Sequence, residues 1–405
     1  MNLTTGMSRA RGIVVAALML AGTLGLAACG GSASSASPGA AAPAAGGAAG
    51  VSLATSLSTA HDSWAVLPVS SGPAFWEVFA RPSDSSDWRL VTPPGVADTG
   101  GLVASAYGSS SLTVAVRPSD KLVFSPLAST SDGGSSWSAG GPIDSAVAAS
   151  PDALAASGSR LVALLSDGAI ETSANAGATW SVAAAPGAIA ASPAGHGCGG
   201  AVAVTSVTFG ILGTQVLAGG SCGTSGTAVF SYSPGAGWQR LSRPAGGQLV
   251  RLYAGTALLR GAAGLSALWY GSGWDASAPL ATPSPVATQT GWGASTPLPV
   301  SGRIVASGAL GESGSLAPSG TWVLLSGGRA ATIDAPAAAA EGTAQWTLLP
   351  RVPSGTSVLA SGPSGATDAL AVSGATVTVW RLGPKATVWS KVQTISVPVQ
   401  YGSSS

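Results

Sequence analysis

A turn motif that ends in tryptophan recurs along this chain and limits the folds open to it. The run Thr130–Trp137 has the pattern S/T-x-D-x-G-x-x-W, Ser173–Trp180 repeats it with asparagine for aspartate, and Ser231–Trp238 is a degenerate third copy. An aspartate or asparagine side chain accepts hydrogen bonds from backbone N–H groups just after it, and glycine supplies a positive φ. Each copy therefore predicts a tight turn, with the tryptophan covering the hairpin. The defining residues of the two good copies are Thr130, Asp132, Gly134 and Trp137, and Ser173, Asn175, Gly177 and Trp180.

Composition indicates an all-β chain with many turns. The 405 residues include 58 Gly, 27 Pro and 13 Trp, and only 8% are charged. From residue 51 onward, short apolar runs alternate with Gly/Ser/Pro turns, and long helical periodicity is absent. The net charge of +1 argues against nucleic acid as a partner, because no basic stripe is present to neutralise phosphates.

The spacing of the tryptophans predicts a repeat of about 50 residues, in the range of propeller blades. In six of the seven cases a proline follows four to six residues later, and proline ends a strand because it has no N–H for the ladder. We therefore expect a β-propeller, most simply with seven blades. The long gap before Trp346 leaves open an eighth blade around Arg303–Ser326 or one blade with a long insertion. The tryptophans that set this repeat are Trp88, Trp137, Trp180, Trp238, Trp274, Trp346 and Trp389.

The turn motif resembles the Asp-box (BNR) repeat of sialidase-like and related propellers. In that family the box lies on the hairpin between the third and fourth strands of a blade, away from the central site. The resemblance implies that the boxes are structural. For ring closure we favour Ile395–Gln400 completing the first blade, and the alternative is that Val51–Leu57 pairs with the last blade.

The first 50 residues predict a targeting signal and a linker rather than a folded domain. Arg9 and Arg11 precede an apolar stretch that ends in Leu-Ala-Ala-Cys29, which resembles the lipobox of bacterial lipoproteins. We assign residues 1–28 to a lipoprotein signal peptide, 29–50 to the lipidated Cys29 and a flexible linker, and 51–405 to the propeller. The linker would hold the propeller roughly 25 Å from the membrane. The expected location is the outer face of the bacterial cytoplasmic membrane.

Cys198 and Cys222 remain after Cys29, and two cysteines in an exported chain predict a disulfide. The pair would join the start of one strand to the end of its neighbour in the fourth blade. The competing interpretation is a metal site that adds His196, but it lacks a clear fourth ligand. We expect no metal and no cofactor. His61, the other histidine, is expected to be an exposed loop residue.

The Asp-box resemblance also raises catalysis of the sialidase type, which uses an arginine cluster, a tyrosine nucleophile with a glutamate partner, and an aspartate acid/base. Arg251 and Tyr253 alternate on one predicted strand and would share a face, yet no glutamate can be placed beside them. Paired carboxylates of the glycosidase kind are also missing. We therefore predict no catalytic residues.

The favoured function is a monomeric, surface-anchored, non-catalytic propeller that binds a partner protein or a cell-envelope glycan. An assembly factor for a membrane complex is a further alternative, suggested by Asp-box propellers with that role. Most tryptophans are expected to pack between blades. The candidate ligand-binding residues, which include the tryptophans outside the repeat positions, are Trp76, Trp269, Trp292, Trp322, Trp380, Arg251 and Tyr253.

Overall fold

The structure is a computed structural model that describes residues 54–398, apart from 71–74, 95–99, 118–124, 139–144, 148, 211–212, 224–225, 242–246, 254–255, 271–291, 295–296, 299, 311–319 and 335–344. The predicted signal peptide, Cys29 and linker lie outside the described residues. Among the helices of the described part, none is long and apolar enough to cross a membrane.

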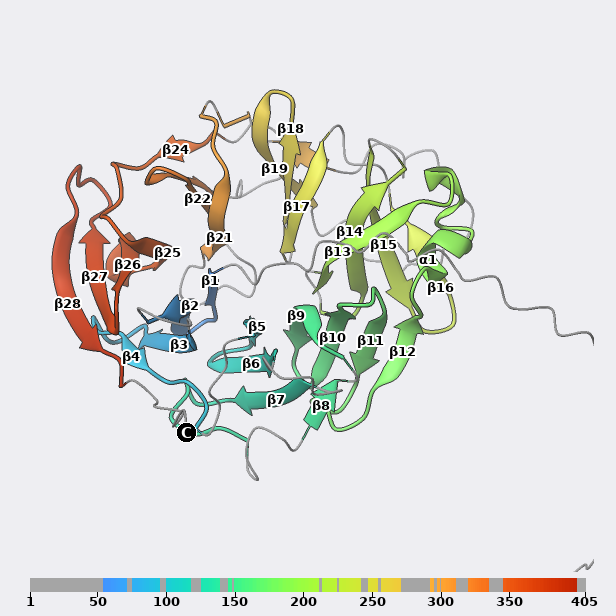
Figure 1. Cartoon of the computed structure of the whole chain (residues 1–405), viewed down its shortest axis with the longest axis horizontal. Helices are drawn as coiled ribbons and strands as arrows, with labels where there is room; N and C mark the ends of the chain where they lie inside the picture. The colour runs from blue at the N-terminus through green and yellow to red at the C-terminus, as the bar shows by residue number, and fades with distance from the viewer. Residues whose placement is uncertain are drawn as a thin grey trace, which may run out of the picture. The chain divides into compact units, whose positions relative to one another are not determined.

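Seven four-stranded antiparallel sheets, each built from four consecutive strands, make a seven-bladed β-propeller (Figure 1). Blades 1 and 2 contain β1 (Thr55–Ser58), β2 (Asp62–Val69), β3 (Phe75–Pro82) and β4 (Arg89–Leu90), then β5 (Leu102–Tyr107), β6 (Ser111–Val116), β7 (Ser125–Thr130) and β8 (Ser145–Val147). Blades 3 and 4 contain β9 (Pro151–Ser157), β10 (Arg160–Leu165), β11 (Ile170–Ser173) and β12 (Ser181–Ala184), then β13 (Val202–Phe209), β14 (Val216–Cys222), β15 (Gly226–Ser233) and β16 (Gly237–Arg240). Blades 5 and 6 contain β17 (Gln248–Tyr253), β18 (Thr256–Gly261), β19 (Gly264–Tyr270) and β20 (Trp292–Ala294), then β21 (Ile304–Leu310), β22 (Gly320–Leu325), β23 (Arg329–Asp334) and β24 (Thr347–Leu348). Blade 7 contains β25 (Thr356–Ser361), β26 (Thr367–Ser373), β27 (Thr376–Leu382) and β28 (Ser390–Ser396).

The helices of the described part of the chain are short and lie in connections. They are α1 (Ala188–Ala191) and the 3₁₀ helices η1 (His196–Cys198) and η4 (Pro363–Gly365). In each blade the first strand is nearest the centre of the ring and the fourth is at the rim, as β25 and β28 illustrate in Figure 1.

The second strands of the blades are buried over most of their length, because each sheet is covered on both faces by its neighbours. In β6 and β10, five successive residues are buried, from Leu112 to Val116 and from Leu161 to Leu165. Such strands are continuous runs of Ala, Val and Leu rather than alternating patterns. The apolar core is correspondingly divided into clusters between neighbouring blades, such as one between blades 1 and 2 and another between blades 2 and 3.

The blade count follows the predicted repeat except in blade 5. There the outer strand β20 opens with Trp292, which pairs with Tyr270, whereas Trp274 lies outside the described residues. With Trp292 as the marker in place of Trp274, the interval from Trp238 to Trp346 divides into two equal steps of 54 residues, the length of a blade. Arg303–Ser326 is therefore not an eighth blade, because it supplies β21 and β22 of blade 6.

Among the described residues no strand is exchanged between the ends of the ring, so neither predicted closure is found. Ile395 pairs with Val377 in blade 7 rather than with blade 1, and β1 pairs with β2 in blade 1. Side chains join the two blades instead. The Trp88 indole N–H donates to Asp368 Oδ2 (2.9 Å), and Gln393 exchanges two hydrogen bonds of 2.8 Å with the backbone of Trp88.

Candidate functional site

The Asp boxes lie on connections between third and fourth strands, as the family resemblance implied. Thr130 ends β7 and Ser173 ends β11, and the boxes follow directly. In the first box, Thr130 Oγ1 donates to Asp132 Oδ1 (2.8 Å), the backbone N–H of Ser136 donates to the same oxygen (2.9 Å), and the N–H of Gly134 donates to Thr130 Oγ1 (3.0 Å). These bonds lie within the motif and hold the turn together.

The box aspartate is strongly acidic because of these bonds. Hydrogen bonds from the Ser136 side chain and backbone, and then from Thr130, lower the pKa of Asp132 to about 2. Gly134 has φ +82°, and a Cβ there would lie 2.7 Å from Cβ of Val91 in blade 1. The box therefore requires glycine for its backbone and for its contact with the preceding blade.

The repeat tryptophans join each blade to the one before it. The indole N–H groups of Trp137, Trp238 and Trp389 donate to backbone carbonyls in or next to the outer strand of the preceding blade. The indole N–H of Trp88 donates to the Asp368 carboxylate of blade 7 and so links the ends of the ring. Trp180 and Trp346 pack against apolar clusters at the corresponding interfaces. The carbonyl bonds are Trp137 to Val91 (2.9 Å), Trp238 to Ala183 (2.9 Å) and Trp389 to Pro350 (3.3 Å).

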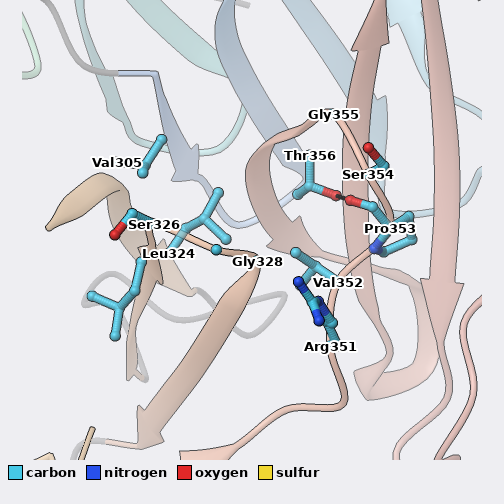
Figure 2. Close-up of a pocket in the computed structure, with 12 residues that line it drawn as sticks. Val305, Leu324, Ser326, Gly328, Arg351, Val352, Pro353, Ser354, Gly355 and Thr356 are labelled. Atoms are coloured by element: carbon cyan, nitrogen blue, oxygen red, sulfur yellow. Dashed lines mark hydrogen bonds between the residues drawn. The ribbon is translucent and has the colours of Figure 1, made fainter. Parts of the chain in front are cut away.

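A pocket of about 320 Å³ lies on the other end of the blades, between blades 6 and 7 (Figure 2). Because the strands of a blade are antiparallel, connections from second to third strands and from one blade to the next share the end opposite the boxes. The pocket is lined by the β22–β23 turn and by the crossing from β24 to β25. Its lining residues are Val305, Leu324, Leu325, Ser326, Gly327, Gly328, Arg351, Val352, Pro353, Ser354, Gly355 and Thr356.

Two β-turns of the same kind face each other across this pocket (Figure 2). The N–H of Gly328 donates to the Leu325 carbonyl (3.3 Å), and the N–H of Thr356 donates to the Pro353 carbonyl (3.2 Å). The third residue of each turn is a glycine with positive φ, +85° at Gly327 and +79° at Gly355, as type II turns require. The bond from the N–H of Val352 to the Gly328 carbonyl (3.1 Å) fixes the two turns relative to each other.

The first strands of the blades, as far as they are described, do not carry the side chains of a sialidase-like site. In the described chain, the first strands of the blades carry one arginine, Arg251, and one acid, Asp152, which pairs with Arg117 (3.2 Å). Tyr253 is buried and its hydroxyl donates to Ser307 Oγ (2.9 Å) across blades 5 and 6. The Arg251 guanidinium lies 5.6 Å from the centre of the Tyr253 ring, so the two residues do contact each other.

Two of the predicted ligand-binding residues, Trp322 and Tyr253, are buried. Trp322 has no exposed surface and donates its indole N–H to Ser56 Oγ (2.7 Å), which makes it a core residue. Trp76 and Trp380 are half-buried against apolar clusters. Trp269 and Trp292 lie on β19 and β20, but their side chains are outside the described part. Tyr253 has 7% of its surface exposed.

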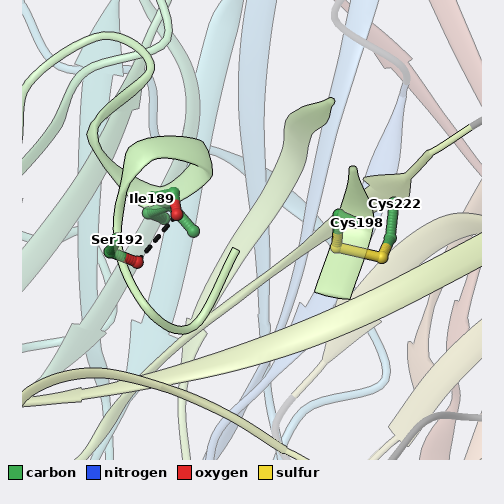
Figure 3. Close-up of a disulfide and its surroundings, with 4 residues drawn as sticks. All are labelled: Ile189, Ser192, Cys198 and Cys222. Atoms are coloured by element: carbon green, nitrogen blue, oxygen red, sulfur yellow. Dashed lines mark hydrogen bonds between the residues drawn. A yellow bond between two sulfur atoms is a disulfide. The ribbon is translucent and has the colours of Figure 1, made fainter. Parts of the chain in front are cut away.

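The cysteine pair forms a disulfide in blade 4 (Figure 3). Cys198 lies in η1 just before β13, and Cys222 ends β14, where it pairs with Val202. The predicted connection between the start of one strand and the end of its neighbour is therefore confirmed. The nearby helix end is fixed by Ser192, whose hydroxyl donates to the Ile189 carbonyl (2.7 Å). His61 and His196 are exposed, and no group of three potential metal-binding side chains occurs among the residues described.

Sequence reasoning missed the pocket between blades 6 and 7. The two turns share the signal Ser-Gly, at Ser326-Gly327 and Ser354-Gly355. That signal is not specific in a chain with 58 glycines. Only the packing of blade 6 against blade 7 brings the turns together.

No protein-family model and no curated protein matches the chain. Solved structures do. The periplasmic gluconolactonase PpgL of Pseudomonas aeruginosa is 14% identical in sequence, with a TM-score of 0.51. The match covers 82% of this chain and 95% of that chain. YCF48 from Cyanidioschyzon merolae is 14% identical, with a TM-score of 0.46 and 82% and 96% covered. A structure of YCF48 bound to D1 peptide is 16% identical, with a TM-score of 0.45 and 82% and 93% covered. At these identities the similarity is one of fold.

Proposed function

We propose that this protein is a lipid-anchored, extracytoplasmic propeller that binds a partner protein and catalyses no reaction. The observation that carries the proposal is the pocket between blades 6 and 7. Its walls are two main-chain turns with aliphatic and hydroxyl side chains and Arg351, and hydrogen bonds within and between the turns hold them in place. A rigid pocket that offers backbone groups and one cation suits a peptide segment.

The chemistry of the pocket favours binding over catalysis. Arg351 is its only charged lining residue, and its hydroxyl groups belong to Ser326, Ser354 and Thr356. A hydroxyl nucleophile needs a general base within hydrogen-bond reach. The Thr356 hydroxyl donates to the Pro353 carbonyl (2.7 Å) and Ser326 Oγ accepts the N–H of Arg303 (3.3 Å), so both have structural roles.

A protein partner is favoured over a glycan for a separate reason. Sugar sites commonly use aromatic rings as platforms, and no aromatic side chain lines this pocket. The tryptophans whose side chains are described are buried or half-buried between blades. An assembly factor for a membrane complex is one form of this protein-binding role.

Attachment to the membrane is proposed from the run that ends at Cys29. A lipid anchor with more than one acyl chain gives stable attachment, and a linker of some twenty residues would keep the pocket near the membrane surface. A Cys29→Ser variant is expected to leave the membrane fraction. Retention of that variant in membranes would overturn the anchor.

Site-specific crosslinking in cells tests the binding role. A photoreactive amino acid at Ser354, on the rim of the pocket, is expected to give one discrete adduct with a partner protein in the full-length chain. The matched control places it at Ala236, which is exposed on the box-bearing end of blade 4. Equal adducts from both positions, or none from Ser354, would contradict the proposal. Turnover of a fluorogenic sialoside that depended on Arg251 would contradict it as well.

A further inference from the structure

The pocket between blades 6 and 7 carries an excess of positive charge. Arg351 lines it and is exposed, and neither Arg351 nor the exposed Arg303 forms an ion pair within the described residues. Arg329 follows the lining residue Gly328 and donates to the Ser301 carbonyl (2.7 Å). Between residues 297 and 366 the only acid described is Asp334. It pairs with Gly320 at the opposite end of blade 6, and none of the three arginines forms an ion pair with an acid of the described residues.

The Arg351 side chain holds no other described residue in place, in contrast to the side chains of Arg329 and Arg381 in blades 6 and 7. The Arg329 guanidinium bonds a carbonyl, and the Arg381 guanidinium bonds Asp368 (2.7 and 2.9 Å). No hydrogen bond from the Arg351 side chain occurs among the described residues. Its guanidinium can therefore offer a full set of donors to a ligand.

Backbone donors lie on both sides of the same pocket. Within the described chain, the N–H groups of Gly327, Ser354 and Gly355 have no acceptor, because they belong to the central residues of the two turns. Unpaired N–H groups in turns favour the binding of anions. Figure 2 shows Arg351 and Ser354 on the same side of the pocket, facing Ser326 and Leu324.

We infer that this pocket binds a carboxylate on an acidic segment of the partner protein. This inference rests on the proposed function and names the chemistry of its ligand. A planar guanidinium binds a carboxylate through two parallel N–H···O bonds. One lining arginine matches the single charge of a carboxylate, while Val305, Leu324 and Val352 suit the aliphatic part of a peptide. A phosphate dianion would place a second negative charge against these apolar walls.

Peptide binding to the full-length protein tests the inference. The probe is a fluorescein-labelled peptide of alternating aspartate and glycine with an amidated C-terminus, followed by fluorescence anisotropy. The asparagine counterpart is the neutral control, and a glycine-serine peptide with a free C-terminus tests the terminal carboxylate as the source. Charge-assisted hydrogen bonds predict that Arg351→Ala weakens binding about tenfold to a hundredfold.

The matched control is Lys385→Ala, which removes one exposed positive charge at the box-bearing end of blade 7. It should leave the affinity unchanged. Binding of either carboxylate peptide that depends on Arg351 supports the inference and identifies the source. Equal binding of the asparagine peptide, an unchanged affinity in Arg351→Ala, or stronger Arg351-dependent binding of inorganic phosphate would overturn it. If a Ser354 crosslink persists while peptide charge has no effect, the protein-binding role stands and only the carboxylate inference fails.

Discussion

At the scale of single residues, the two Asp boxes show which property of the aspartate matters. Asn175 Oδ1 accepts the N–H of Thr179 (2.9 Å) and the Ser173 hydroxyl (3.0 Å), the same two kinds of bond that Asp132 accepts. Its amide also donates to Thr179 Oγ1 (3.0 Å). The turn therefore needs an acceptor oxygen at this position and does not need a negative charge.

Substitutions at Asp132 should separate the contribution of its hydrogen-bond acceptor to stability from the contribution of its negative charge. Asp132→Asn is expected to change the free energy of unfolding by less than about 1 kcal/mol at neutral pH, and Asp132→Ala to lower it by about 1 kcal/mol or slightly more. The box is exposed to water, so larger effects are not expected. Urea unfolding measures both, with Asn175→Asp and Asn175→Ala as the matched pair. A loss in Asp132→Asn as large as in Asp132→Ala would show that the charge is essential.

The same residue predicts a pH dependence. The pKa of Asp132 is about 2 in the folded protein against an ordinary value of 3.8. A depressed pKa means that the contribution to stability is complete above the ordinary value and is lost as pH falls toward 2. The stability difference between the wild type and Asp132→Asn should therefore be constant at neutral pH and shift below pH 4. A difference that did not vary with pH would contradict the low pKa.

At the scale of elements, blade 4 carries a constraint that the other blades described here lack. Its disulfide joins residues 24 apart in sequence and ties η1 to the end of β14. The half-cystines are buried. The loop that leads into β13 is thereby held against the sheet.

Removal of the disulfide should destabilise blade 4 more than the rest of the ring. The loop-entropy relation gives about 3 kcal/mol for a loop of this size. The double variant Cys198→Ser with Cys222→Ser should unfold at lower urea concentration, and hydrogen exchange should rise first in β13 and β14. Uniform loss of protection around the ring would mean that the blades unfold only as one unit.

The strands of each blade were largely predictable, whereas the pocket was not. Proline ended three of the outer strands as expected, because β4 stops before Pro93, β12 before Pro186 and β24 before Pro350. In blade 2 the expectation was wrong, since the outer strand β8 begins after Pro142. The error in blade 5 arose because Trp274 and Trp292 compete as markers, and only strand pairing selects Trp292. Burial of Trp322 depends on Ser56, 266 residues away, and sequence spacing cannot reveal such a contact.

At the scale of the whole molecule, polar side chains within an apolar interface, here called the seam, join blade 1 to blade 7 and close the ring. Asp368 has no exposed surface, and it accepts bonds from Arg381 and from the Trp88 indole. The buried Arg81 donates to the Ser361 carbonyl across the seam (2.9 Å). Around these groups, residues of blades 1, 6 and 7 form one continuous core cluster. Because no strand is shared between blades 1 and 7 in the described chain, we infer that these charged groups fix how the two blades align.

Loss of the Asp368 carboxylate should therefore lower the free energy of unfolding more than loss of a carboxylate on the surface. Asp368→Ala leaves the Arg81 and Arg381 guanidinium groups without their counter-charge, and breaking a buried pair in this way costs about 3–5 kcal/mol. Asp368→Asn keeps an acceptor for Trp88 and should cost less. Asp334→Ala, an exposed position in blade 6, is the control. Urea unfolding gives the energies, and hydrogen exchange at β4 and β28 should rise in Asp368→Ala before it rises elsewhere. If Asp368→Ala behaves like the control, the apolar seam closes the ring alone and Asp368 only neutralises its arginines.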